Sequence, residues 1–506
     1  MAPLWQRVSE LRRNVAANLV GRAWVMVLGI AFIPVYLRFL GMEAYGLVGF
    51  FATLQGVFGL LDLGLGATIN RELARLSASA ERRDDQRALL RTLELCYWGI
   101  SITTGCLVLA LAPGIAHHWV HASRLSPLSV ERAIRLMGLV LALQLPFSFY
   151  QAALMGLQRQ VAVNAIVVST ASARSVGTAL VLWRLSASVE AFFICQLAIS
   201  LVQTAVTLVV VWSGVGGAFS VRPQFARLRS IWRYAAATSA NSIVGITLTQ
   251  LDKVLLSRLL PLEQFGYYAL AGTMASFIWA VAIPINQALF PRFAQLVELG
   301  DDTTLTTLYH RASQIMAIAL VPAAATVIAF SWELMFLWTR NPGTASQTAL
   351  IAALLIAGTT CNGLASVPGY LQAAAGWPEL MVYTNVAAAV VLVPGILLIA
   401  PRYGAPGAAF VWLVLNAGYI VFNVPVMHTR LLRGELWRWY REDLAGPVAG
   451  AIAAVLVGRW LMPHGASKLM AAGWILGVWA FALAACALLA SRIRPEIFSR
   501  FMPARA

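Results

Sequence analysis

Charged side chains are scarce in this chain of 506 residues: only 11% are Asp, Glu, Lys or Arg, while 60% are hydrophobic. A soluble domain carries about 25% charged residues, so the composition excludes an ordinary soluble fold. Acidic residues are the rarer kind, because 21 Asp and Glu stand against 37 Lys and Arg, which gives a net charge of +16. The five cysteines lie far apart, and their spacing predicts neither a disulfide framework nor a zinc site.

Motifs of several enzyme classes are also missing. The chain has no G-x-x-x-x-G-K-[ST] phosphate loop, no G-x-S-x-G elbow, no H-E-x-x-H pair and no dinucleotide-binding fingerprint. His117, His118 and His121 lie close together, but no nearby carboxylate or cysteine would complete a metal site. The short predicted external loops argue against a membrane glycosyltransferase or polymerase. We therefore expect no catalytic residue, no metal and no cofactor.

Long apolar runs dominate the sequence instead, and its mean hydropathy is +0.75. A helix of about 20 apolar residues crosses the hydrocarbon core of a bilayer. The runs therefore predict an all-α integral membrane protein with about fourteen transmembrane helices. Their approximate bounds are 14–37, 44–69, 92–116, 133–157, 161–183, 190–213, 234–257, 264–290, 312–337, 347–373, 379–400, 404–427, 444–462 and 469–491.

The basic residues predict the orientation of these helices. If the N-terminus is cytoplasmic, most arginines fall on cytoplasmic segments, as the positive-inside rule requires. The main clusters are Arg7–Arg13, Arg71–Arg91, Arg222–Arg233, Arg430–Arg441 and Arg492–Arg505. Both termini are thus expected in the cytoplasm, and the positive charge is expected to contact anionic lipid headgroups. No basic segment is interleaved with a stacking platform, so nucleic acid is not an expected partner.

An internal repeat aligns residues 38–76 with 258–296 without a gap. Identical pairs include Arg38 and Arg258, Leu40 and Leu260, Glu43 and Glu263, Gly46 and Gly266, and Thr53 and Thr273. Each segment lies at the junction of the first two helices of a six-helix block. We interpret this as two pseudo-symmetric six-helix lobes, residues 1–215 and 216–430, followed by two extra helices and a cytoplasmic tail in 431–506. Transporters are commonly built from such repeats.

Ionisable residues inside the predicted helices are candidate functional residues, because each costs about 2.5–3.5 kcal/mol at the bilayer centre. They lie on stripes of polar and small residues at helical spacing. The stripes contain Asn18 and Arg22; Gln55, Gly59 and Asp62; Thr170 and Arg174; and Asn241, Thr249 and Asp252. We expect the stripes to line a shared polar cavity.

A structural role is the alternative for these charges. Arg22 with Asp62, and Arg174 with Asp252, would then be buried ion pairs that hold the bundle together. Asp252 and Lys253 are neighbours and point about 100° apart on a helix, so only one of them can face a cavity squarely. Asp252 continues the polar stripe and is the better candidate.

Two segments resemble a known family. Pro34–Arg75 contains L-G-x-x-x-Y-G at Leu40–Gly46 and L-D-L-G-L-G at Leu61–Gly66, and Gln250–Ala271 is a second match. They resemble the Wzx-type flippases of lipid-linked oligosaccharides, whose superfamily also holds the MATE drug exporters and the MurJ-type lipid II flippases. The resemblance implies a bacterial inner-membrane protein with two six-helix bundles, a cationic cavity and alternating access. It implies that an undecaprenyl-diphosphate-linked glycan is carried to the outer leaflet.

The substrate that the resemblance implies suggests a role for each kind of residue on the stripes. Guanidinium groups bind phosphate through strong charge-assisted hydrogen bonds, and amide side chains bind sugar hydroxyls. A carboxylate that takes up H+ or binds Na+ would couple transport to a gradient. The expected substrate-binding residues are Arg22, Arg174, Asn18, Gln55, Asn241 and Lys253. The expected ion-coupling residues are Asp62 and Asp252. Membrane lipids, a polysaccharide polymerase and a chain-length regulator are the further expected partners.

Three other functions stay open at this point. A MurJ-like lipid II flippase differs mainly in its substrate. A MATE-like exporter of organic cations would favour a cavity dominated by carboxylates, whereas this chain has at least as many cations. A non-transporting scaffold for envelope assembly would not need polar stripes on several helices.

The topology gives a first testable prediction. A reporter fused at Arg229 should behave as cytoplasmic, because the segment after the sixth predicted helix is rich in arginine. A reporter fused near Arg402 should behave as periplasmic. Alkaline phosphatase and green fluorescent protein fusions at both sites measure this, and opposite labelling at either site would contradict the arrangement.

Overall fold

The computed structural model describes residues 18, 20–77, 82–216, 221–225, 249–463, 465 and 467–495. Within these residues the regular structure is helical, apart from an isolated β-bridge between His121 and Pro261. The predicted all-α fold is therefore confirmed.

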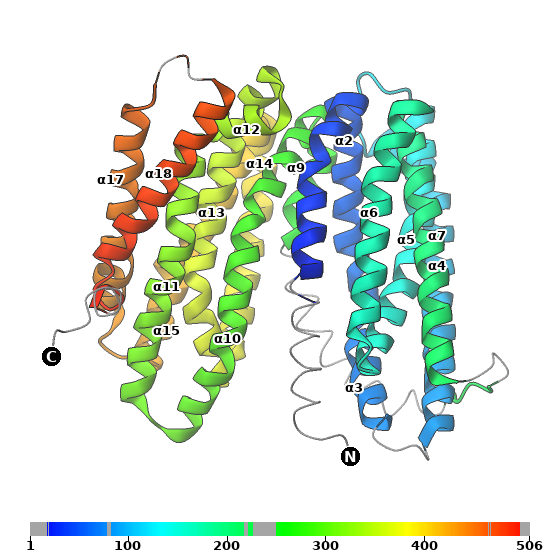
Figure 1. Ribbon diagram of the computed structural model, residues 1–506, viewed down its shortest axis with the longest axis horizontal. Coiled ribbons are helices and arrows are strands. Elements are labelled where there is room, and N and C mark those ends of the chain that lie inside the picture. Colours follow the sequence, from blue (N-terminus) through cyan, green and yellow to red (C-terminus); the bar gives the residue numbers. More distant parts are fainter. Residues whose placement is uncertain are drawn as a thin grey trace. The chain divides into compact units, whose positions relative to one another are not determined.

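Helices follow one another along the described chain (Figure 1). The order begins with helix Val20–Ala31 and continues with α2 (Ile33–Phe58), the 3-10 helix η1 (Gly59–Asp62), α3 (Leu65–Leu76), α4 (Arg83–His118), α5 (Pro127–Gly156), α6 (Gln160–Arg184), α7 (Val189–Val215) and a helix at 249–259. After it come α9 (Leu262–Ala275), α10 (Phe277–Leu299), α11 (Asp302–Ala329), α12 (Ser331–Thr339), α13 (Pro342–Ala374), α14 (Pro378–Gly418), the π-helix η4 (Tyr419–Asn423), α15 (Val424–Arg430), α16 (Leu436–Arg438), the π-helix η5 (Trp439–Ala445), α17 (Gly446–Trp460) and α18 (Lys468–Leu489).

Eleven of the described helical stretches are long and apolar enough to cross a membrane. Two of them contain a break at a glycine: Gly41 has φ of 78° and Gly404 has φ of 62°. Glycine adopts positive φ angles without the strain that a side chain adds. The first break falls between the first and second predicted spans, and the second break falls at the start of the twelfth. The predicted span 234–257 lies largely outside the described residues, so the number fourteen stays a prediction.

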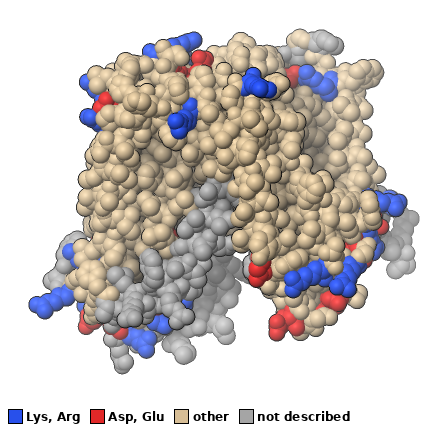
Figure 2. Space-filling model, turned by 180° about the vertical axis from the view of Figure 1, so that it is seen from behind, with Lys and Arg blue, Asp and Glu red and all other residues tan. Residues whose placement is uncertain are grey.

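The surface of these helices is suited to lipid. Large apolar side chains stand exposed along them, for example Leu201 and Val209 on α7. In Figure 2, Lys and Arg side chains gather toward the helix ends, and the surface between the ends is mostly uncharged. An apolar band of this kind matches the hydrocarbon core of a bilayer. The chain is a multi-pass membrane protein.

The chain divides into two compact units, Met1–Gly266 and Tyr267–Ala506. In the first unit α5 packs against α3, α4 and α7, and α6 packs against α7. Its core contains a buried acid, Glu94, which accepts hydrogen bonds from Tyr150 Oη (2.6 Å) and Trp212 Nε1 (3.0 Å) and is paired with Arg91 (2.7 Å). These partners offset the cost of burying the carboxylate.

Two glycines that the repeat pairs with each other make equivalent contacts. Gly46 lies against the backbone carbonyl of Leu262, and a Cβ on Gly266 would come within 2.8 Å of the backbone carbonyl of Met42. Met42 and Leu262 are themselves paired by the repeat, so each contact becomes the other when the two copies of the repeat are exchanged. A side chain at either glycine would collide with backbone. The reciprocal geometry supports the interpretation of 38–76 and 258–296 as a repeat.

In the second unit α13 packs against α10, α11, α12 and α14, while α17 and α18 pack against each other and against α11. A buried histidine connects α11 to the segment before α17. His310 Nδ1 lies 2.6 Å from Asp443 Oδ2, and His310 Nε2 lies 3.0 Å from Glu435 Oε2. A carboxylate only accepts hydrogen bonds, so the imidazole satisfies both ionised acids when each ring nitrogen carries a proton.

Gln314 extends this cluster to the end of the described chain. Its Nε2 donates to Asp443 Oδ1 (3.0 Å) and to Ser491 Oγ (3.1 Å), and its Oε1 accepts from the backbone N–H of Arg492 (2.9 Å). The segment that follows α18 is thereby held against α11. Polar contacts of His310 and Gln314 thus attach the last two helices to the second unit.

The cluster predicts the effect of removing its histidine. His310→Ala leaves the fully buried Asp443 without its closest partner, and breaking a buried pair costs about 3–5 kcal/mol. We expect lower membrane abundance and a clearly lower unfolding temperature in detergent, measured by fluorescence-detected gel filtration after heating. Thr303→Ala, at an exposed position of the same helix, is the control. Equal stability of the two variants would contradict a structural role for the cluster.

Candidate functional site

A cavity of about 860 Å³ lies within the first unit, and half of the 20 residues that line it are polar. Helix Val20–Ala31, α2, η1, α5, α6 and α7 contribute to its wall. Its polar lining consists of five glutamines, two serines, a tyrosine, one cation and one acid. These residues are Gln55, Gln144, Gln151, Gln196, Gln203, Ser148, Ser175, Tyr36, Arg174 and Asp62. The cavity is therefore rich in neutral hydrogen-bonding groups.

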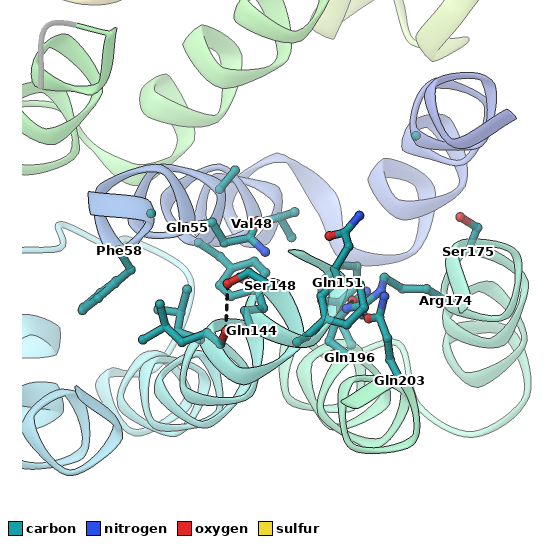
Figure 3. Close-up of a pocket in the computed structure, with 18 of the residues that line it drawn as sticks. Val48, Gln55, Phe58, Gln144, Ser148, Gln151, Arg174, Ser175, Gln196 and Gln203 are labelled. Atoms are coloured by element: carbon teal, nitrogen blue, oxygen red, sulfur yellow. Dashed lines mark hydrogen bonds between the residues drawn. The ribbon is translucent and has the colours of Figure 1, made fainter. Parts of the chain in front are cut away.

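Arg174 on α6 is the cation of this cavity. Its Nη1 donates to Gln196 Oε1 (2.7 Å), and its Nη2 donates to Gln203 Oε1 (2.9 Å) and to Ser200 Oγ (3.2 Å). Figure 3 shows Gln196 and Gln203 beside the Arg174 side chain. All three acceptors are neutral, and within the described residues no carboxylate forms an ion pair with Arg174. The guanidinium is held in place while its positive charge is not neutralised.

The local sequence of α7 explains this cradle. Gln196, Ser200 and Gln203 are spaced four and three residues apart, so they lie on one face of the helix. The helix begins at Ser188, whose side chain accepts a hydrogen bond from the backbone N–H of Ala191 (3.2 Å). This cap satisfies one of the free N–H groups at the helix start. The capped helix presents its three acceptors together to α6.

Asp62 lines the same cavity at the point where the helix breaks. It ends η1, and the next two residues, Leu63 (φ 48°) and Gly64 (φ 67°), are left-handed. Asp62 Oδ1 accepts from Tyr97 Oη (2.5 Å), and Asp62 Oδ2 accepts from the backbone N–H of Gly66 (3.3 Å). A Cβ on Gly66 would lie only 2.9 Å from Oδ1, so glycine allows this close approach. The L-D-L-G-L-G motif therefore builds a helix break capped by its own acid.

The structure brings Gln55, Asp62 and Arg174 together, as the polar stripes predict. Asn18 and Arg22 do not line the cavity. Asn18 instead forms an amide cluster with α6, in which its Nδ2 donates to Gln160 Oε1 (3.2 Å) and its Oδ1 accepts from Asn164 Nδ2 (2.5 Å). Arg22 is exposed. Neither position supports the expected contact of these two residues with the other stripes.

The remaining candidates lie on the segment that contains the helix at 249–259. Asp252 is buried (4% exposed) and Lys253 is half-buried, and neither is among the residues that line the cavity. Asn241 lies outside the described residues. The cavity thus contains three of the eight predicted site residues.

The structure also tests the two ion pairs that the sequence offered as alternatives. Arg174 bonds to neutral side chains rather than to Asp252, and Asp62 bonds to Tyr97 and Gly66 rather than to Arg22. Neither predicted pair forms among the described residues. Neutral donors and acceptors already occupy the hydrogen-bonding positions around both charges, so neither charge needs an ionic partner.

Sequence reasoning missed several cavity residues. Gln144, Ser148 and Gln151 on α5 are spaced four and three residues apart, and so are the three acceptors on α7. This is the spacing that identified the other stripes. A neutral stripe was recognised on the predicted span 264–290, at Thr273, Ser276 and Gln287, but the neutral stripes of α5 and α7 were not. No group of three or more His, Cys, Asp or Glu in the described residues is placed to hold a metal.

Comparison with known proteins identifies relatives of this chain. The sequence profile of the family described as "Polysaccharide biosynthesis protein" matches residues 11–297, more than half of the chain. A Shigella flexneri protein provisionally named an O-antigen transporter is 20% identical over 404 residues, which cover 79% of this chain and 94% of that protein. These matches confirm the family resemblance drawn from the sequence.

Solved structures share the fold. The lipid II flippase MurJ in an inward closed conformation aligns over 96% of this chain and 99% of its own, with a TM-score of 0.70 and 11% identity. An inward-facing multidrug resistance MATE family transporter of the MOP superfamily covers 80% of this chain and 94% of its own, with a TM-score of 0.68 and 12% identity. The relatives are transport proteins, in agreement with the expectation that this chain is not an enzyme.

The environment of Asp62 gives a prediction about stability. Tyr97→Phe removes a hydroxyl donor from a carboxylate, and a hydrogen bond to a charged group contributes about 1.5–3 kcal/mol. The unfolding temperature in detergent should fall, and Asp62→Asn should lower the cost of the tyrosine change because the acceptor is no longer charged. Tyr403→Phe, at an exposed position, is the control. A Tyr97→Phe protein as stable as this control would contradict the Asp62 cap.

Proposed function

The chain belongs to the polysaccharide biosynthesis protein family, and on this basis we propose that it carries an undecaprenyl-diphosphate-linked oligosaccharide from the cytoplasmic to the periplasmic leaflet. Transport would proceed by alternating access in the bacterial inner membrane, for the synthesis of a surface polysaccharide. The observation that carries the proposal is the cavity in which Arg174 is surrounded by neutral amides and hydroxyls.

The chemistry of that cavity matches a diphosphate-sugar headgroup. A guanidinium whose charge is offset only by dipoles still attracts an anion, and Arg binds phosphate oxygens with strong, directional hydrogen bonds. The glutamine and serine side chains of the lining donate and accept hydrogen bonds, which is the capacity that sugar hydroxyls require. The arginine would thus bind the diphosphate, and the glutamines and serines would bind the sugar.

Two other functions receive less support. An organic cation would meet the charge of Arg174, while the one acid of the lining, Asp62, already accepts two hydrogen bonds. A scaffold without transport has no use for a polar cavity inside an apolar bundle, where buried polar groups are costly.

Lipid II transport is the second candidate. The similarity to the MurJ fold over 96% of the chain favours it, and its substrate class carries the same lipid diphosphate. A deletion strain distinguishes the two candidates, because it should accumulate either a surface-polysaccharide intermediate or a peptidoglycan precursor on the cytoplasmic side. For coupling we keep Asp62 and Asp252 as the candidates and H+ or Na+ as the ion, with a polymerase and a chain-length regulator as partners of the pathway.

The charge of Arg174 can be tested without removing the residue. Gln196→Glu converts a neutral acceptor at 2.7 Å into a carboxylate, so the guanidinium keeps its position while the new carboxylate neutralises its positive charge. If that charge binds the diphosphate, flipping of a lipid-diphosphate oligosaccharide in vesicles should fall to the level of Arg174→Gln, at normal protein abundance. Arg174→Lys should retain part of the activity, because the charge remains and the planar fork is lost.

A matched control exists on the surface of the second unit. Arg292 Nη1 donates to Gln295 Oε1 at 2.6 Å, so Gln295→Glu makes the same chemical change at an exposed pair. This variant should transport normally. Full transport by Gln196→Glu would show that the positive charge of Arg174 is not used, and the diphosphate role would be lost.

A further inference from the structure

A second cavity, of about 490 Å³, lies in the second unit where α17 and α18 are joined. It is bounded by α12, by the end of α17 and by the start of α18. The charged groups in its lining are Glu333, Arg459 and Lys468. None of these residues is among the predicted site residues, and the proposed function does not use them.

Aromatic side chains place this cavity at a membrane boundary. Trp460 is 82% exposed and Trp332 is 40% exposed, and Trp332 stacks on Phe336 with ring centroids 5.2 Å apart. Tryptophans are enriched where lipid headgroups meet the hydrocarbon core. The ammonium group of Lys468 lies 5.1 Å from the centroid of the Phe336 ring, within the range of a cation–π contact. The cavity therefore lies at the level of the lipid headgroups, and a ligand would enter it from there.

The acid of the cavity is only half satisfied. Glu333 Oε1 accepts from Arg459 Nη1 at 2.5 Å, while Glu333 Oε2 is buried and has no hydrogen-bond partner among the described residues. A buried acceptor without a donor is costly, and such groups in native proteins usually mark a missing partner. Arg459 and Lys468 could serve only to extend their charges to the lipid headgroups. That role would explain neither the cavity nor the unpaired oxygen of Glu333.

The charges define the missing partner. Two cations and one acid leave room for a ligand with one negative and one positive group. A phosphate would bind Lys468 and the exposed side of Arg459. The Glu333 side chain is 16% exposed, and a rotation of its carboxyl group would bring the buried Oε2 to the cavity, where an N–H of an ammonium group would donate to it. We propose that this cavity binds the headgroup of a zwitterionic phospholipid with a primary ammonium, of the phosphatidylethanolamine class.

The proposal makes a selectivity prediction that needs no mutation. Phosphatidylcholine has the same phosphate but no N–H donor, so it cannot satisfy Glu333 Oε2. Binding to the purified full-length protein can be measured by native mass spectrometry. It should be about tenfold weaker for phosphatidylcholine than for phosphatidylethanolamine, which corresponds to a difference of about 1.4 kcal/mol in binding free energy. The N-monomethyl and N,N-dimethyl lipids should still bind, because each keeps an N–H. Equal binding of phosphatidylcholine, or stronger binding of phosphatidylglycerol, would overturn the proposal.

Variants then assign the selectivity to this cavity. Glu333→Gln and Lys468→Gln should each remove most of the preference for phosphatidylethanolamine. Glu131→Gln is a matched control, since Glu131 is 15% exposed and paired with a half-exposed Arg135, while Glu333 is 16% exposed and paired with Arg459. The control should keep the preference. A preference that survives in both Glu333→Gln and Lys468→Gln would show that the lipid binds elsewhere.

Discussion

The constraint on which this structure depends is that a polar group in an apolar bundle must find a partner inside the protein. No water in the hydrocarbon core is available to replace a missing hydrogen bond. The buried charges meet this demand in two ways. Glu94 is paired with the Arg91 guanidinium, and His310 lies between the carboxylates of Asp443 and Glu435. Arg174 is surrounded by neutral acceptors instead.

These two solutions have different consequences for ligand binding. An arginine paired with a carboxylate presents little net charge, and an anionic ligand would have to displace the acid. An arginine held by amides keeps its charge, and its side chain is already ordered, so less conformational entropy is lost when a ligand binds. The glutamines can also exchange one hydrogen bond for another, which a transport protein needs in order to release its cargo.

The sequence predicted the features that depend on composition and spacing along one helix. Apolar runs predicted the helices, and the stripe through Gln55 and Asp62 predicted part of the cavity. Arg174 was found because a charge inside a membrane helix is rare. The neutral faces of α5 and α7 were missed, although Gln144 and Gln196 lie on stripes with the same spacing, because amides are ordinary residues in a sequence.

Contacts between helices could not be predicted in this way. The spacing of Asn18 and Arg22 places them on one face of their helix, but it does not say which neighbour covers that face. In the structure, Gln160 and Asn164 of α6 take up Asn18, and Arg22 is left exposed. The ion pairs suggested for Asp62 and Arg174 failed for the same reason. Their partners, Tyr97 and Gln196, come from helices whose packing the sequence pattern does not contain.

The division between the two units falls inside the second copy of the repeat. The repeat places the start of its second copy near residue 216, whereas compactness places the division at Gly266. The loop between α4 and α5 explains the difference, because it bonds to both copies. The Glu43 carboxylate accepts from the backbone N–H groups of Ser123 and Arg124, and the backbone carbonyl of His121 accepts from the N–H of Leu262 (2.9 Å).

The acid that the repeat pairs with Glu43 meets the same loop. Glu263 lies 4.0 Å from the Arg124 guanidinium, and Trp119 Nε1 donates to Ser257 Oγ (3.0 Å). The start of the second copy is thereby attached to the first unit by the α4–α5 loop and by the close approach at Gly46. A repeat reflects similarity between two segments of the sequence, whereas the compact units reflect which helices contact one another. The two boundaries differ because the repeat interpretation assigns residues 249–266 to the second lobe, whereas packing assigns them to the first unit.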